Sequence, residues 1–166
     1  MIEIGTASTG SVEETRSVGA ALAELARPGD VIVLAGDLGT GKTAFAQGFA
    51  RGLGVTEPVT SPTFVLARTY EGRLRLHHLD VYRLDHLQEA EDLGLAELVD
   101  DKGATLIEWG DVIAPTLPPE HLEVRLAYGA GSDDRSLRLA AAGKAWAVRA
   151  DALRRLLGRW TGVAGC

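Results

Sequence analysis

Residues 36–43 read Gly36-Asp37-Leu38-Gly39-Thr40-Gly41-Lys42-Thr43, which matches the pattern G-x-x-x-x-G-K-[S/T] of phosphate-binding loops. Glycines let the backbone take up positive φ and approach an anion closely, so that consecutive N–H groups can surround phosphate oxygens. The lysine of the pattern reaches the β- and γ-phosphates, and the hydroxyl of its last residue binds Mg²⁺. The segment therefore predicts a loop that binds a nucleoside triphosphate together with Mg²⁺.

The segments on either side of this loop have the patterns that a phosphate-binding loop requires. Val31 to Leu34 is apolar and rich in β-branched residues without alternation, which is typical of a strand buried on both faces. After the loop, a helix expected from about Lys42 to Arg51 presents Phe45, Phe49 and Leu53 as an apolar stripe. A helix that starts directly at the loop would add the positive end of its dipole to the phosphate site.

The other elements are predicted from apolar periodicity, caps and turn residues. Ser11 and Glu14 have the spacing of a capping box, and Glu71-Gly72 is a hairpin signal. Helices are expected over residues 11–26, 84–99 and 145–157, and strands over residues 64–70, 73–80, 104–108, 121–128 and 136–141. This order predicts an α/β fold, a P-loop NTPase-type sandwich with a mixed sheet that is parallel at its centre and flanked by helices. We expect residues 1–166 to form a single domain, while the strand order stays open.

Composition narrows the classes of function. The chain has 166 residues, of which 46% are hydrophobic and 24% charged, and its net charge of −6 argues against binding nucleic acid by bulk electrostatics. Any role on RNA is therefore expected to run through a partner protein. No apolar run approaches the roughly 18–20 residues of a membrane helix, and the N-terminus lacks a signal-peptide pattern. With Cys166 as the one cysteine, no internal disulfide is expected, and the predicted location is cytoplasmic.

Two acidic residues stand at the ends of predicted strands. Asp80 ends the segment 74–79, and Glu108 ends the segment 105–107. Because ligands of α/β sheets bind at the carboxyl ends of the strands, both carboxylates are expected beside the phosphate loop. We expect Asp80 to bind Mg²⁺ directly or through water and Glu108 to orient or deprotonate the attacking water, although their roles could be exchanged.

The predicted site residues follow from these motifs. Glu108 and Lys42 are the expected catalytic residues, and Thr43, Asp80 and Glu108 are the expected Mg²⁺ ligands. The expected nucleotide contacts are Asp37, Leu38, Gly39, Thr40, Gly41, Lys42, Thr43, Ala44, Ser61 and Thr63.

Three further features leave alternatives open. The hydroxyl-rich loop 60–63 has the place of a γ-phosphate-sensing switch, but a plain turn would have the same composition. His77 and His78 are adjacent on a strand and point to opposite faces, so they cannot bind one metal ion together. Trp109 could stack on a base or belong to the core.

The absence of one residue type favours adenine over guanine. Guanine-specific GTPases commonly use an Asn/Thr-Lys-x-Asp element. This chain contains no asparagine, and its three lysines follow Gly41, Asp101 and Gly143. The element is therefore absent, and ATP is the expected nucleotide.

Together these motifs resemble the TsaE (YjeE) family, small bacterial ATPases of tRNA threonylcarbamoyladenosine biosynthesis. Beside the phosphate loop, the matching segments are Val59-Thr60-Ser61-Pro62-Thr63-Phe64, His78-Leu79-Asp80-Val81-Tyr82-Arg83-Leu84 and Ile107-Glu108-Trp109. The resemblance covers roughly residues 5–128, and order, spacing and length agree. Gly110-Asp111 stands where the family pattern has Pro-Glu, and the stretch after Gly129 carries no recognised motif.

The resemblance implies an activity, partners and residue roles. Members of the family act with TsaD and TsaB; TsaD transfers a threonylcarbamoyl group to adenosine 37 of tRNAs that read codons beginning with A. The TsaE-like subunit hydrolyses ATP and is thought to reset the complex, so tRNA is met only indirectly. Thr43 and Asp80 would bind Mg²⁺, Glu108 would be the catalytic acid, and Ser61 to Phe64 would form a switch loop.

Two other functions compete with this interpretation. A small-molecule kinase would close an arginine-rich lid over the phosphates, but the region after Leu84 is acidic. A nucleotide-dependent binding switch with negligible turnover would need only the loop. The chain offers no obvious arginine finger beyond Arg68 or Arg83, so an ATPase is expected to be weak alone and stronger with partners.

Overall fold

A computed structural model of the chain describes residues 1–60, 67–80, 102–108, 117 and 119–161. Several predictions made from the sequence lie outside these residues. They are the helical region 84–99, the loop residues Ser61 and Thr63, and the side chains Tyr82, Arg83 and Trp109.

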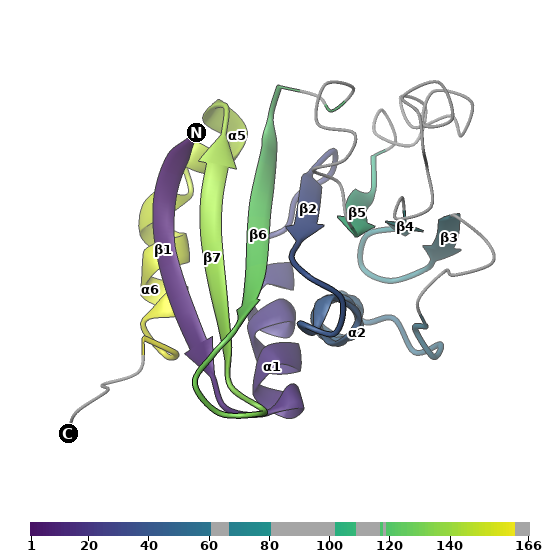
Figure 1. Cartoon of the computed structure of the whole chain (residues 1–166). Coiled ribbons are helices and arrows are strands. Elements are labelled where there is room, and N and C mark those ends of the chain that lie inside the picture. Colours follow the sequence, from purple (N-terminus) through teal and green to yellow (C-terminus); the bar gives the residue numbers. More distant parts are fainter. Residues whose placement is uncertain (61–66, 81–101, 109–116, 118, 162–166) are drawn as a thin grey trace.

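Within the described residues the strands form one mixed sheet in the order β1-β7-β6-β2-β5-β4-β3 (Figure 1). The strands are β1 (Ile2–Thr9), β2 (Val31–Ala35), β3 (Ala67–Tyr70), β4 (Leu76–Asp80), β5 (Ala104–Glu108), β6 (His121–Tyr128) and β7 (Arg135–Ala142). The central strands β6, β2, β5 and β4 run parallel, whereas β1, β7 and β3 join antiparallel at the two sides. This arrangement confirms the predicted α/β sandwich with a sheet that is parallel at its centre.

Strand β1 was not among the predicted elements, and its backbone explains why. Its pairing with β7 shifts register between Glu3 and Gly5, which interrupts the alternation of buried and exposed side chains. As the edge strand it also leaves Ile2 exposed. The uninterrupted run of alternating buried and exposed residues is therefore too short to identify the strand from sequence.

The second predicted hairpin strand was too long at its start. Residues 73–75 precede β4 because their backbone groups pair elsewhere. The N–H of Arg73 donates to Leu53 O, and Arg75 O accepts from the N–H of Ala104. The first contact ties the turn before β4 to the end of the helix that follows the phosphate loop, and the second ties it to the start of β5.

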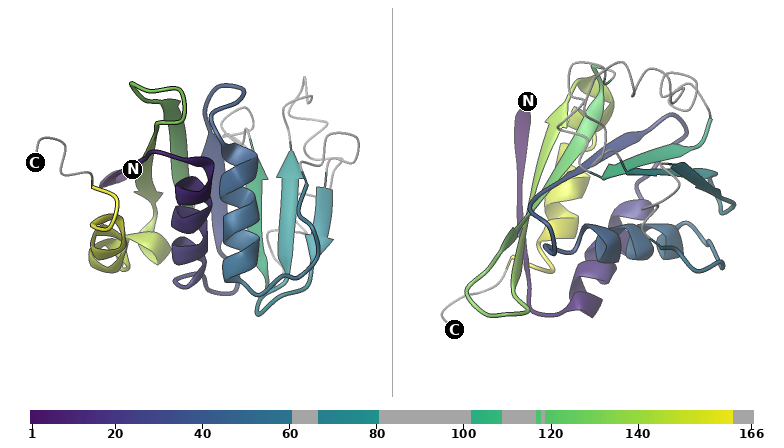
Figure 2. Two further views of the ribbon diagram at one scale, coloured as in Figure 1. Left: turned by 90° about the horizontal axis from the view of Figure 1, so that it is seen from below. Right: turned by 45° about the vertical axis from the view of Figure 1, so that its right-hand side comes forward.

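Four described helices cover one face of the sheet (Figure 2). They are α1 (Val12–Ala23), α2 (Lys42–Gly52), α5 (Lys144–Ala147) and α6 (Ala150–Leu157). Ser11 caps α1 as predicted, since its side chain accepts from the N–H of Glu14, but the helix ends at Ala23 rather than near Ala26. Within the part of the chain that the structure describes, no helix has the length and apolar character needed to cross a membrane.

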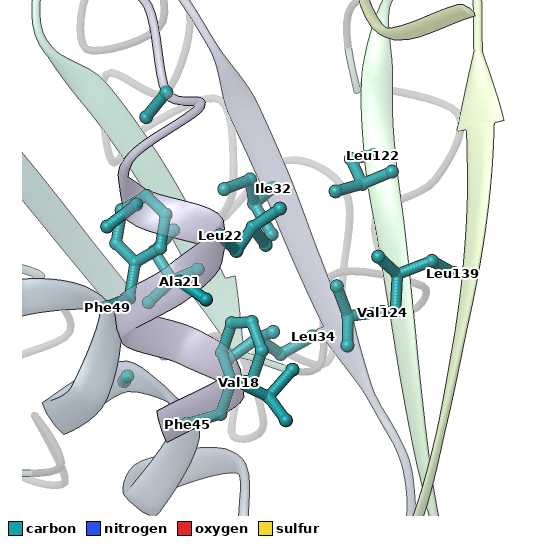
Figure 3. Close-up of a cluster of buried hydrophobic side chains, with 14 of the residues drawn as sticks. Val18, Ala21, Leu22, Ile32, Leu34, Phe45, Phe49, Leu122, Val124 and Leu139 are labelled. Atoms are coloured by element: carbon teal, nitrogen blue, oxygen red, sulfur yellow. The ribbon is translucent and has the colours of Figure 1, made fainter. Parts of the chain in front are cut away.

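The helix after the phosphate loop is fixed in place by its packing on α1. A Cβ added at Gly48 of α2 would lie 1.8 Å from Arg16 O, and one added at Gly19 of α1 would lie 2.4 Å from Phe45 O. Glycine therefore permits an approach of the two helix backbones that any side chain would prevent. On the same helix, Phe45 and Phe49 pack with residues of α1 and β2 in the core (Figure 3).

The predicted C-terminal helix is divided by a buried arginine. Arg149 stands between α5 and α6, and its guanidinium makes two 2.8 Å hydrogen bonds to the Asp30 carboxylate, with both side chains at most 5% exposed. The same group stacks on the Trp146 ring at 3.8 Å and donates to Leu25 O. Because Asp30 directly precedes β2, this ion pair anchors the C-terminal helices to the strand that leads into the phosphate loop.

We expect Asp30→Asn to lower the free energy of unfolding by about 3–5 kcal/mol, because removing one partner leaves a buried charge uncompensated. Urea unfolding followed by circular dichroism would measure the change. Glu3→Gln is the matched control, since its ion pair with Arg138 lies on the surface and should contribute far less. Equal losses of stability in the two variants would contradict the assigned role of the buried pair.

Candidate nucleotide-binding site

The phosphate loop connects β2 to α2. Gly36, Gly39 and Gly41 have φ of 138°, 82° and 104°, which are values that favour glycine. Lys42 Nζ donates to Gly36 O at 2.7 Å and to Asp37 O at 2.8 Å. The ammonium group therefore lies across the loop, at the point where incoming phosphate oxygens could replace the carbonyls as its acceptors.

The start of α2 offers backbone donors to an anion. Gly41 is the N-cap residue, and no side chain caps the helix. The N–H groups of the first turn have no intrahelical acceptors. Together with the helix dipole, they make this end of α2 suited to phosphate.

The parallel register brings the predicted acids to the loop. Glu108 pairs with Leu34 of β2 on one side and with Asp80 of β4 on the other. Thr43 Oγ1 lies 3.4 Å from Glu108 Oε1, although Glu108 is 3% exposed. Thr43, Asp80 and Glu108 therefore stand at one edge of the sheet, where the sequence predicted them.

A buried histidine completes this group. His78 is fully buried, and its Nε2 lies 2.5 Å from Glu108 Oε2. The two carboxylate oxygens of Glu108 thus contact different side chains: Oε2 faces His78, and Oε1 faces Thr43. His77 points to the opposite face, as predicted, and its Nδ1 lies 3.1 Å from Thr69 Oγ1.

Sequence analysis did not single out His78 as part of the site. The available signal was its spacing, since residues two apart on a strand share a face and His78 precedes Asp80 by two. Spacing alone could not show that the neighbouring strand places Glu108 within hydrogen-bonding distance. That contact depends on the β4–β5 register.

A small, open hollow with a cavity volume of about 70 Å³ lies beside the loop and was also not predicted from sequence. It is bounded by the phosphate loop, the N-terminal turn of α1 and the turn between β6 and β7. Its lining residues are Ser11, Val12, Thr15, Gly39, Gly41, Ala44, Asp133 and Arg135. Of these, Gly39, Gly41 and Ala44 were expected to contact a nucleotide, whereas the other residues come from segments distant in sequence.

The remaining predicted contacts are divided between the loop and residues outside the described part of the chain. Leu38 is 72% exposed at the apex of the loop, and Thr40 is buried with its hydroxyl 2.7 Å from Asp37 O. Ser61 and Thr63 lie outside the described residues. Of the two arginines considered as a finger, Arg68 is exposed on β3 opposite His78.

Comparison with known proteins identifies relatives over most of the chain. Residues 9–137 match the model of the family "Threonylcarbamoyl adenosine biosynthesis protein TsaE". The chain is 44% identical over 144 residues to the tRNA threonylcarbamoyladenosine biosynthesis protein TsaE of Bacillus subtilis, covering 86% of this chain and 89% of that protein. It is also 44% identical to the protein of the same name from Treponema pallidum, over 70% of this chain and 86% of that protein.

A solved structure shares the fold. The crystal structure of Bacillus subtilis YdiB superposes with a TM-score of 0.75 at 38% sequence identity, covering 93% of each chain.

We expect His78→Leu to lower the free energy of unfolding by about 1–3 kcal/mol, because it leaves a buried Glu108 oxygen without its donor. Replacing both partners, as in His78→Leu with Glu108→Leu, should cost less than the sum of the single changes and recover part of that loss. Chemical denaturation of both single variants and the double variant would give the coupling energy. Additive effects would show that the two side chains do not interact.

Proposed function

The chain belongs to the TsaE family, and from this membership and the geometry of its loop we propose that it binds ATP with Mg²⁺ and hydrolyses it. The observation that carries the proposal is the meeting of Lys42, Thr43 and Glu108 at the carboxyl edge of the parallel strands. A loop that only bound phosphate would need no buried carboxylate beside its hydroxyl.

The donors around the loop fit a polyphosphate. Gly39 and Gly41 give the backbone a conformation in which N–H groups can line an anion site, and α2 adds uncapped donors. Lys42 adds a positive charge beside the carbonyls of Gly36 and Asp37. When a triphosphate binds, the ammonium exchanges loop carbonyls for β- and γ-phosphate oxygens.

The oxygen ligands at the edge of the sheet fit Mg²⁺. A hydroxyl from Thr43 and a carboxylate from Asp80 are hard donors that would hold Mg²⁺, which commonly takes one or two carboxylates together with substrate phosphates. Glu108 would bind the ion if the roles of the two acids were exchanged. Thr43 Oγ1 and Glu108 Oε1 already face one another across 3.4 Å. When bound, the ion would supply charge neutralisation for the β- and γ-phosphates.

Glu108 is placed to act on the attacking water. With Oε2 occupied by His78, its Oε1 is the oxygen that faces the loop. In the hydrolysis, water attacks the γ-phosphorus, the bond to the β-phosphate oxygen breaks, and the carboxylate accepts the proton of the water. The products are ADP and inorganic phosphate. Positioned proton transfer of this kind typically contributes about 10²–10⁴ in rate.

The hollow beside the loop is the proposed site of the adenosine moiety. It adjoins Gly39, Gly41 and Ala44, so a nucleotide whose phosphates fill the loop can extend into it. Arg135 stands on its wall, and a guanidinium can stack on a planar base. Ser61 and Thr63 remain proposed contacts of the nucleotide, at its γ-phosphate.

The curated relatives are named for tRNA threonylcarbamoyladenosine biosynthesis, and we assign the chain to the same process. We propose that it acts in the cytoplasm with homologues of TsaD and TsaB, which modify adenosine 37, and meets tRNA only through them. The net charge of −6 agrees with an indirect role. Since a partner-supplied arginine is worth about 10³–10⁵ in rate, hydrolysis should be slow in the isolated chain.

The test is ATP hydrolysis by the purified chain with Mg²⁺, alone and with TsaD and TsaB. We expect slow turnover alone, a clear rise with the partners, and a loss of at least about 10² in rate for Glu108→Ala. Glu71→Ala is the matched control, because this exposed acid at the β3–β4 turn forms a surface ion pair with Arg75.

Each rival function gives a different result in the same assay. Nucleotide binding without turnover, even in the presence of TsaD and TsaB, would favour a binding switch. Turnover that the partners leave unchanged would contradict the proposed partnership. Phosphate transfer to small hydroxyl compounds would then be screened, because it would identify a kinase.

A further inference from the structure

The turn between β6 and β7 binds the apex of the phosphate loop from outside. Tyr128, the last residue of β6, donates its hydroxyl hydrogen to Leu38 O. Arg135, the first residue of β7, donates more weakly to Gly39 O at 3.4 Å. We propose that Tyr128 is a positioning residue for nucleotide binding, which presets the apex of the loop for the phosphates; this role rests on the proposed function.

The planarity of the peptide unit links the Leu38 carbonyl to the N–H of Gly39. In a trans peptide, the carbonyl and the following N–H point in opposite directions. Because Leu38 O accepts from the hydroxyl of Tyr128, the N–H of Gly39 points away from the tyrosine, and in our proposal it is one of the donors offered to phosphate. The tyrosine hydroxyl thus restrains the direction of one backbone donor of the loop.

The loop needs such a restraint because of its composition. Three of the six residues from Gly36 to Gly41 are glycine, which loses more conformational freedom on ordering than any other residue. Within the loop, Lys42 Nζ donates to Gly36 O and Asp37 O, and the N–H and hydroxyl of Thr40 both donate to Asp37 O. If Lys42 turns to the phosphates, its two bonds are given up, whereas Tyr128 and Arg135 still hold the apex carbonyls of Leu38 and Gly39.

Tyr128 is itself held in place by its neighbours. It is the register partner of Arg135, whose guanidinium lies 4.8 Å from the centre of the tyrosine ring. Arg135 also donates to Ser132 O at 2.9 Å and to Asp134 O at 2.8 Å, which fixes the guanidinium within the turn. A Cβ added at Gly39 would lie 2.9 Å from the tyrosine hydroxyl, so the contact with the loop is close.

The test compares two variants that each remove one tyrosine hydroxyl. Tyr128→Phe keeps the ring and its contact with Arg135 but loses the bond to Leu38 O. Tyr70→Phe is the control, because the Tyr70 hydroxyl is buried on β3 and has no hydrogen-bond partner among the described residues. Calorimetry would measure the Kd for ADP with Mg²⁺, and thermal unfolding without nucleotide would measure the stability of each free variant.

We expect the Kd of Tyr128→Phe to rise about 2- to 12-fold, the equivalent of one net hydrogen bond, while Tyr70→Phe binds as the wild type does. The Gly39 amide resonance in a ¹⁵N–¹H correlation spectrum should also move or broaden in free Tyr128→Phe and stay in place in Tyr70→Phe. A purely structural contribution would lower the melting temperature without selecting this resonance.

Unchanged or tighter ADP binding by Tyr128→Phe, or equal weakening in both variants, would overturn the role of Tyr128. An unmoved Gly39 resonance in Tyr128→Phe would overturn it as well. If the wild type itself failed to bind ADP, the proposed function would fall together with this role. Normal wild-type binding with an unaffected Tyr128→Phe would remove only the role of Tyr128.

Discussion

The parallel pairing of β2 with β5 on one side and β6 on the other is the constraint on which the site depends. It places the phosphate loop between the carboxyl ends of two neighbouring strands. On the β5 side that end carries Glu108, and on the β6 side it leads to Tyr128 and the turn that holds the apex of the loop. One strand arrangement therefore supplies the acid, the loop and its external support.

The groups that fix this arrangement are polar and buried. Arg149 binds Asp30 at the start of β2, and His78 contacts Glu108 at the end of β5. Burying such groups costs free energy unless they are paired. Each pair therefore adds little net stability, but it disfavours arrangements of the strands in which the two partners are separated. The close packing of α1 on α2 through Gly19 and Gly48 then sets the direction of the helix that begins at the loop.

Local patterns were sufficient to predict much of this structure. The motif at residues 36–43, the buried strand before it and the apolar stripe after it each depend on neighbours in sequence, and the structure has a strand, loop and helix there. Asp80 and Glu108 were likewise found at strand ends. These features follow from the repeat of about 3.6 residues in a helix, the repeat of about 2 residues in a strand, and the conformational freedom of glycine.

What the sequence did not predict depends on contacts between distant segments. The pairing of His78 with Glu108 requires the β4–β5 register, and the wall of the hollow requires residues 133 and 135 to return beside α1. The edge strand β1 was missed because a register shift interrupts its alternation. The break between α5 and α6 follows from the buried contacts of Arg149, which helical periodicity does not report.

The central claim is that the loop and the acid at the end of β5 form one site for a nucleotide with Mg²⁺. Its most direct test is the affinity for ADP measured with and without Mg²⁺, in the wild type, in Thr43→Val and in the control Thr69→Val, whose hydroxyl contacts His77 on the other face of the sheet. We expect Mg²⁺ to tighten ADP binding in the wild type and the control, whereas Thr43→Val should lose this gain but still bind ADP without the ion. Binding that is insensitive to Mg²⁺ in the wild type, or a gain retained in Thr43→Val, would contradict this claim.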